Sequence, residues 1–227
     1  MNLLQISTSQ ALDTVGIGSG EQAISVWDLM LKGGYMMIPL LVLSMLAVSI
    51  FIERVFTIRN ASKTPNQFID KIKNLVTVGD INGARLLCAQ TESPVAKMIE
   101  KGISRIGSPL KNIEVSIENV GKIEIYKLEK NLSLLATISG AAPMIGFLGT
   151  VTGMIQAFIS IAQEEGSVSP KLLSAGIYEA MITTAAGLMV GIIAYLGYNY
   201  LVARVQKVVH KMEYTSVDFI DLLQEPR

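Results

Sequence analysis

The stretch GIYEAMITTAAGLMVG, residues 176–191, is almost wholly apolar or small, yet it contains the carboxylate of Glu179 and the hydroxyls of Thr183 and Thr184. It continues to Ala203 without any further Asp, Glu, Lys or Arg. A helix needs about 20 mostly apolar residues to cross the hydrocarbon core of a bilayer. The stretch therefore predicts a membrane-spanning helix with polar groups inside the membrane.

Two further windows lack charged side chains, Gly33–Ile52 and Asn131–Gln163, and the third reaches back to Leu172 if Glu179 is included. Of the 227 residues, 50% are hydrophobic and only 17% are charged. Three such windows rarely coincide in a soluble chain, so membrane spans are favoured over buried helices of a soluble domain. We expect an all-α integral membrane protein with three transmembrane helices.

Lys and Arg are spread unevenly around these windows. Thirteen lie in the segment Arg54–Lys130 and four in the tail, whereas the N-terminal stretch has only Lys32 and the loop before the third window only Lys171. Positively charged loops mark the cytoplasmic side, which places the N-terminus and that loop outside. The expected regions are an outer N-terminus with an amphipathic surface helix (1–34), transmembrane helix 1 (35–56), a cytoplasmic helical domain (57–130), transmembrane helix 2 (131–163), an outer loop (164–171), transmembrane helix 3 (172–203) and a cytoplasmic tail (204–227).

The second window is longer than a bilayer requires. As a helix it would measure about 50 Å, which exceeds the hydrocarbon core by about 20 Å. After Pro109 a helical pattern leads into this window, weakened only at Gly121, so one long helix is expected to rise from the cytoplasm into the membrane. The pairs Ser93-Pro94 and Ser108-Pro109 each predict a helix cap followed by proline at the first helical position. Uncharged helices that project so far need other helices to cover them, which favours a bundle or an oligomer with long helical cytoplasmic extensions.

The polar groups inside the predicted spans raise two separate questions. Thr150 and Thr184 each lie thirteen residues from the outer loop, about 20 Å at helical rise, and so at similar depth. A membrane threonine often bonds only its own backbone, and on the residues alone that interpretation is favoured. Glu179 lies closer to the outer surface and is either a rim residue facing water or a functional carboxylate in a hydrated cavity.

Small residues recur every three or four positions in the second and third spans, a spacing that lets helices approach closely in lipid. Pro143 is expected to kink the second span. The residues expected to serve packing or the kink are Pro143, Gly146, Gly149, Gly153, Gly187 and Gly191, with Ala157, Gly176, Ala180 and Thr184 continuing the two rows.

No Asp, Lys, Arg or His lies in the three windows. If ions cross the membrane here, the proton is carried by Glu179 or by a carboxylate on a partner, because a threonine hydroxyl does not titrate usefully. A single cysteine, Cys88, excludes a disulfide framework. A metal site at the lone His210 is not favoured beside two lysines, and no cofactor is expected.

Two quoted segments resemble a known family. The second span reads ATISGAAPMIGFLGTVTGMIQAF and the third GIYEAMITTAAGLMVGIIAYLGYN. These are similar to the Pro, Gly-x-x-Gly-Thr-Val-x-Gly and Gly-Ile-x-Glu-Ala, Thr-Ala-x-Gly-Leu patterns of the ExbB/TolQ/MotA proton-channel family, closest to ExbB and TolQ. Thr152 and Ile193 depart from those patterns, where a bulky aromatic residue and a proline are common.

The resemblance implies a multi-pass protein of the bacterial inner membrane, with its N-terminus in the periplasm and its C-terminus in the cytoplasm. It implies a pentamer whose second and third spans line a central pore, together with a single-span ExbD- or TolR-like partner that supplies a membrane Asp. Thr150 and Thr184 would face that Asp, with Thr183 beside them and Glu179 nearer the outer mouth. The complex would energise a TonB- or TolA-like protein and would not be an enzyme.

Two alternatives remain open from the residues. A passive membrane scaffold would need the same packing without an ion path. A flagellar-type stator of the MotA kind would need a charged cytoplasmic surface for a rotor and normally has four spans, whereas this sequence predicts three.

Overall fold

The structure is a computed structural model that describes residues 33–63, 67–163 and 170–224, of which the side chains at 170–173 and 175 are not placed. The predicted surface helix before residue 33 and most of the outer loop lie outside the described residues. Every regular element in the described part is a helix. In chain order these are α3 (Met37–Ala61), α4 (Phe68–Val78), α5 (Ile81–Ala89), α6 (Pro94–Ile103), α7 (Leu110–Glu129), α8 (Leu132–Gln163) and α9 (Pro170–Gln224).

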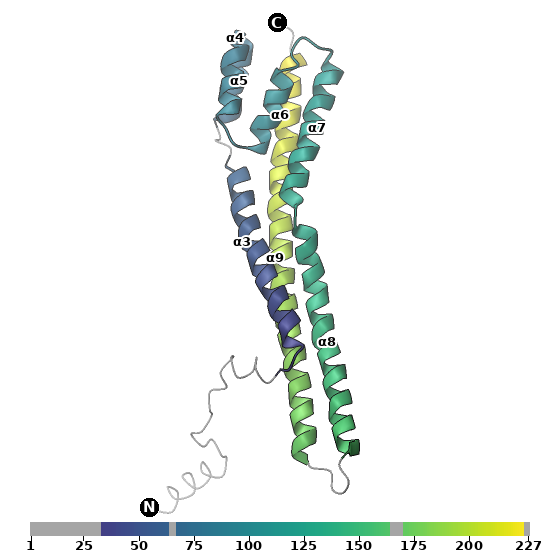
Figure 1. Cartoon of the computed structure of the whole chain (residues 1–227). Coiled ribbons are helices and arrows are strands. Elements are labelled where there is room, and N and C mark those ends of the chain that lie inside the picture. Colours follow the sequence, from purple (N-terminus) through teal and green to yellow (C-terminus); the bar gives the residue numbers. More distant parts are fainter. Residues whose placement is uncertain (1–32, 64–66, 164–169, 225–227) are drawn as a thin grey trace, which may run out of the picture.

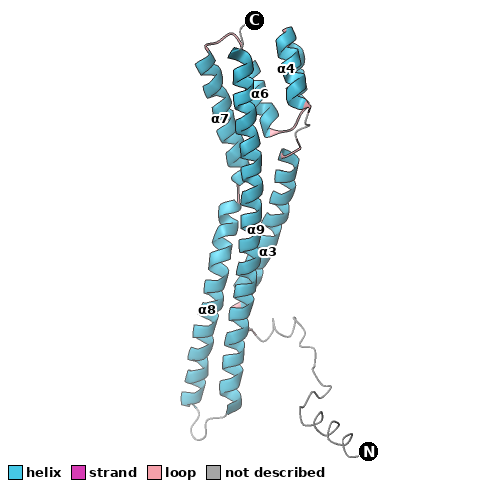
Figure 2. Cartoon of the chain, turned by 180° about the vertical axis from the view of Figure 1, so that it is seen from behind, coloured by secondary structure: helices cyan, strands magenta, loops and turns pink. Residues whose placement is uncertain are grey.

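The molecule is a long rod built around α9, which runs from one end to the other (Figure 1). α8 and α3 pack against one half of α9, and α4 to α7 gather around the other half, near the C-terminus (Figure 2). Within the described residues, three helical segments are long and apolar enough to cross a membrane: Met37–Ala61, Leu110–Gln163 and Gly176–Gln224. The expectation of an all-α membrane protein with three candidate spans is thus confirmed, and the exact membrane boundaries stay a prediction.

The helix expected to run unbroken from Pro109 into the second span is interrupted. Lys130 has φ −49° and ψ 136°, and Asn131 has φ 63°, so α7 ends at Glu129 and α8 starts at Leu132. Asparagine tolerates the left-handed region better than most residues, which makes Asn131 a suitable place for the break. The sequence pointed instead to Gly121, which stays helical.

The helices at the C-terminal end follow local rules. α4 buries one stripe through Phe68, Ile72 and Val76 and ends at Gly79, whose φ of 88° suits a residue without a side chain. Ser93 caps α6 by accepting a hydrogen bond from the amide of Ala96 at 3.2 Å, as predicted. The second predicted cap is wrong, because Pro109 itself occupies the capping position of α7 and Ser108 lies outside it.

Two polar contacts tie these helices together. Lys73 of α4 donates to the carboxylate of Asp218 on α9 at 2.8 Å. Glu124 of α7 is almost fully buried and accepts from Lys97 of α6 at 3.1 Å and from Lys127. Burial alone would raise the pKa of Glu124, but the hydrogen bonds from Lys127 and Lys97 outweigh it and hold that pKa below its usual value. The packing around α9 is therefore partly electrostatic at this end.

Candidate functional site

α8 and α9 pack along a seam of small residues. A side-chain carbon added at Gly146 would lie 2.9 Å from the carbonyl oxygen of Thr183, and one at Gly187 would lie 2.6 Å from the carbonyl oxygen of Ala142. At Gly153 the nearest atom would be the Cβ of Ala180, at 3.1 Å. The two backbones therefore approach more closely than larger side chains would permit, as small-xxx-small spacing predicts.

Thr183 lies inside this seam. Its side chain is packed directly against Gly149, its exposed fraction is 2%, and its hydroxyl donates to the carbonyl of Ala180 at 2.8 Å. The small-residue row predicted on α9 included Thr184, and the Cα of Thr184 does lie 3.2 Å from a carbon added at Gly146. Thr183 packs in the seam as well, and its hydroxyl is satisfied within its own helix.

Thr184 lies at the edge of the seam and joins the two helices. Its hydroxyl donates to the carbonyl oxygen of Gly146 on α8 at 3.0 Å. That is the carbonyl that a regular α-helix would also use for the backbone amide of Thr150. The Thr150 hydroxyl donates to the carbonyl of Phe147 at 2.6 Å. The structure thus brings Thr150 and Thr184 to neighbouring turns of one helix pair, both of them only partly buried.

The two threonines face away from α3. Ile145 of α8 and Ala186 of α9 pack toward α3 beside Met37 and Leu40. Successive residues of an α-helix are turned by about 100°, so Thr150 points about 140° away from Ile145 and Thr184 about 160° away from Ala186. The threonine face and the α3 face are therefore opposite sides of the α8 and α9 pair.

Glu179 lies on the α3 side of that pair. It precedes Ala186 by seven residues, about two helical turns, so the two side chains share a face. Its carboxylate is packed against Gly34, whose φ of 65° places it in the turn that leads into α3, and its side chain is half-buried. No partner for Glu179 was predicted from the sequence, although a Gly33-Gly34 pair directly before a span is a signal of close approach.

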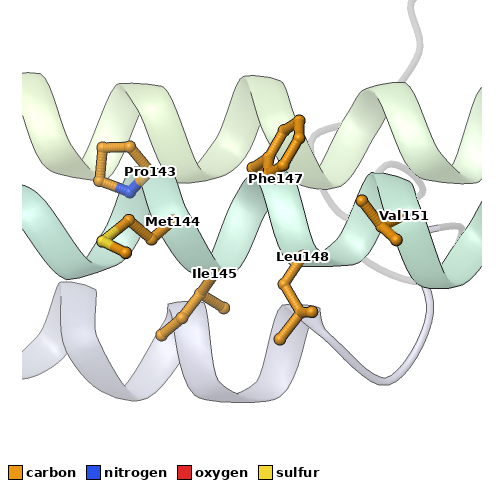
Figure 3. Close-up of a pocket in the computed structure, with 6 residues that line it drawn as sticks. All are labelled: Pro143, Met144, Ile145, Phe147, Leu148 and Val151. Carbon is orange, nitrogen blue, oxygen red and sulfur yellow. The ribbon is translucent and has the colours of Figure 1, made fainter.

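Pro143 precedes Thr150 by seven residues, about two helical turns, so the two lie on the same face of α8. A side-chain carbon added at Gly191 of α9 would meet the proline ring at 2.5 Å, so the missing side chain of Gly191 accommodates the ring. Pro143 also borders an apolar hollow of about 570 Å³ on the surface of α8. Figure 3 shows its lining residues, with Ile145 and Leu148 on one side of α8 and Pro143 and Phe147 on the other.

The part of α8 and α9 that the structure describes up to Ala203 holds a single ionisable acid, Glu179. No group of three or more His, Cys, Asp or Glu capable of holding a metal occurs among the described residues. What the helix pair offers is a pair of hydroxyls on backbone carbonyls in an apolar setting, without its own titrating group on the same face.

Comparison with known proteins shows the family of the chain. The model of the MotA/TolQ/ExbB proton channel family matches residues 90–214, which include α8 and most of α9. The chain is 31% identical to a putative biopolymer transport protein, ExbB-like 1, of Synechocystis sp., over 78% of this chain and 70% of that protein.

Two further relatives are similar over different shares of the chain. A putative ExbB homologue of Methanothermobacter thermautotrophicus is 30% identical over 71% of this chain and 57% of its own length. The Tol-Pal system protein TolQ of Haemophilus influenzae is 37% identical over 43% of this chain and 41% of its own length. The chain belongs to the MotA/TolQ/ExbB proton channel family and is similar to its ExbB and TolQ members.

Proposed function

We propose that the chain is the ExbB- or TolQ-like subunit of a motor in the bacterial inner membrane, driven by the proton-motive force. With an ExbD- or TolR-like single-span partner, it would energise a TonB- or TolA-like protein. The observation that carries the proposal is the pair Thr150 and Thr184, which meets on one face of α8 and α9 opposite α3. That face has hydroxyls but no acid, so the titrating carboxyl would come from the partner.

The hydrogen bonds of the two threonines suggest how the face would act. Each hydroxyl donates a hydrogen bond to a backbone carbonyl. The hydroxyl oxygen can still accept a hydrogen bond from another group. A protonated carboxylic acid can donate to such an oxygen, whereas an ionised carboxylate can only accept. The threonines would therefore bind the partner's acid in its neutral form and release it on ionisation. Alternatively, the hydroxyls would rotate away from the backbone carbonyls and donate to the ionised carboxylate.

The proton-motive force supplies enough energy for such a cycle. One elementary charge that crosses a potential of 100 mV yields about 2.3 kcal/mol, in addition to the pH gradient. This exceeds the net contribution of a typical hydrogen bond between neutral groups, about 0.5 to 1.5 kcal/mol. Proton entry and exit would thus be able to make and break the contact between the partner's acid and successive Thr150 and Thr184 pairs.

We also infer that several copies surround the partner, as the pentamer implied by the family resemblance would. Large side chains at the C-terminal end of the rod remain uncovered in the single chain, among them Tyr126 and Tyr214, which are 77% and 75% exposed. On the predicted topology this end lies in the cytoplasm, where exposed aromatic surface favours contact with another protein. Neighbouring copies are the natural cover.

Glu179 is assigned a different role from the threonines. Because its carboxylate lies against Gly34 on the α3 face, we place it outside the contact with the partner's acid. It would hold the start of α3 against α9 near the periplasmic surface.

The test is the double variant Thr150→Ala with Thr184→Ala, expressed together with the partner in cells that lack their own ExbB- or TolQ-type protein. We expect gradient-dependent uptake across the outer membrane to fall at least tenfold, while the amount of assembled protein stays the same. Thr152→Ala is the matched control, because Thr152 lies on the same helix and donates only to the carbonyls of Leu148 and Gly149. Full uptake in the double variant would instead support the passive scaffold.

A further inference from the structure

The link between α7 and α8 has a feature that the ion path does not use. α7 stops at Glu129 and α8 starts at Leu132, while α9 passes the same level without a break (Figure 2). The last carbonyls of a helix have no partner within that helix. A break inside a rod therefore leaves acceptors that some other element has to satisfy.

Arg54 of α3 supplies a donor at this point. Its Nη1 donates to the carbonyl of Lys127, in the last turn of α7, at 3.2 Å. The side chain is only 6% exposed, an unusual burial for arginine. α3 packs mainly on α9 and α8, and its contact with α7 is small, so this hydrogen bond is a specific bridge rather than part of a broad interface.

The preceding residue, Glu53, contacts the other side of the break. Its carboxylate pairs with Arg54, and it lies close to the charge of Lys130 and to the side chain of Asn131. Asn131 in turn begins α8, because its carbonyl accepts the amide of Leu135 at 3.2 Å. Two consecutive residues of α3 thus hold the end of one helix and the start of the next.

The bridge is incomplete. The Nε of Arg54 is buried and has no hydrogen-bond acceptor among the described residues. A buried donor without a partner destabilises the arrangement that contains it. The broken arrangement therefore carries a local penalty at Arg54, which the other contacts of Glu53 and Arg54 offset.

We propose that Glu53 and Arg54 form a latch that fixes the angle between α7 and α8. With the latch closed, α3 sets how the helices at the C-terminal end are placed relative to those of the threonine face. With the latch open, the segment 110–163 gains access to a straighter, continuous helix. The proposal concerns the shape of the chain and does not depend on the proposed motor function.

The experiment measures a distance across the break between α7 and α8, which changes when the two helices move relative to each other. Nitroxide labels are attached at Asn119→Cys on α7 and Thr137→Cys on α8 in a Cys88→Ser background, since positions 119 and 137 are both exposed. The labelled full chain is mixed with excess unlabelled chain, so that distances within one copy dominate, and the label-to-label distribution is recorded by pulsed electron paramagnetic resonance. In an unbroken helix the two Cα atoms would lie about 27 Å apart.

Arg54→Gln is expected to broaden this distribution and to move it toward the value of the continuous helix. Arg59→Gln is the matched control, because Arg59 is also an arginine of α3 but is exposed and lies in its last turn. An unchanged distribution in Arg54→Gln, or an equal change in Arg59→Gln, overturns the proposal.

A second variant keeps the test decisive if Arg54→Gln does not fold. Glu53 is 53% exposed, so Glu53→Gln is compatible with the fold, while it removes the charge that pairs with Arg54. Broadening in Glu53→Gln then supports the latch. A distribution identical to that of the unsubstituted chain overturns it.

Discussion

At the scale of single residues, Gly187 shows how tightly the threonine face is built. A methyl group there would press on the backbone of Ala142 and Gly146. Gly140 of α8, by contrast, has no neighbouring atom within 4 Å of an added carbon. Replacing each of the two glycines by alanine therefore distinguishes the effect of close packing from the general preference of helices for alanine.

We predict that Gly187→Ala lowers the stability of the folded chain by about 1 to 3 kcal/mol, the usual penalty for forcing extra volume into a packed interface. Gly140→Ala should be neutral or stabilising by up to about 1 kcal/mol, because alanine is the better helix former. Thermal unfolding of the two variants in detergent measures the difference. Equal melting temperatures would show that the seam tolerates a methyl group.

The sequence predicted the row of small residues from its spacing, but not that Thr183 packs in the seam beside Thr184. A spacing of three or four residues from Ala180 and Gly187 admits either threonine. The contact of Thr183 with Gly149 depends on the rotation of α8, which spacing along α9 does not contain. The Glu179 contact with Gly34 was out of reach for the same reason, since it joins two elements far apart in the sequence.

At the scale of elements, the helices α4 and α6 could be predicted from the sequence, because their apolar stripes and caps are formed by residues close together in the chain. The break between α7 and α8 was not, because nothing in the residues around Lys130 forbids a helix. It is fixed by contacts with Glu53 and Arg54, some 75 residues earlier in the chain. Local propensity is a weak prior that tertiary contacts override.

Glu124 makes a prediction about how α6 and α7 are held together. Its pKa is held below the usual value by Lys127 and Lys97 in spite of burial. A carboxyl with a lowered folded pKa adds stability above its unfolded pKa, about 4.3, and that stability is lost as the pH falls through the folded pKa. We expect Glu124→Gln to destabilise the chain by about 1 kcal/mol at pH 7, with a smaller difference from the unsubstituted chain below about pH 4.

Melting temperatures measured from pH 7 down to the lowest pH at which the chain stays folded reveal this effect, because the folded pKa of Glu124 lies below its usual value. Glu118→Gln is the control, because Glu118 pairs with Lys122 on the exposed surface of the same helix. We expect Glu118→Gln to change the melting temperature little across this range, since exposed pairs add little to stability. A difference for Glu124→Gln that does not depend on pH would show that its charge is not the stabilising feature.

At the scale of the whole molecule, α9 connects the two halves. It carries Thr184 in one half and, near its other end, Asp218, which binds Lys73 of α4. A rotation or tilt of α9 caused at the threonine face would therefore reach the helices around its C-terminal end. The latch at Arg54 determines whether α7 follows that movement or yields at the break.

The reactivity of Cys88 reports whether the helices around the C-terminal end of α9 stay packed together. It is buried in the cluster that includes Ala84 of α5, Ile99 of α6 and Met212 of α9, and burial, followed by the charge of Glu100, raises the pKa of its thiol to about 12. Only the thiolate reacts with maleimide, and an ordinary cysteine has a pKa of about 8.5. At pH 8 we therefore expect labelling in the folded chain to be roughly a thousandfold slower than in denaturant.

A cysteine placed at exposed position 137, in the chain with Cys88→Ser, should react rapidly in both conditions. Equal rates at the two sites in the folded chain would mean that the helices around α9 open frequently, and a half that opens frequently could not transmit movement from the threonine face.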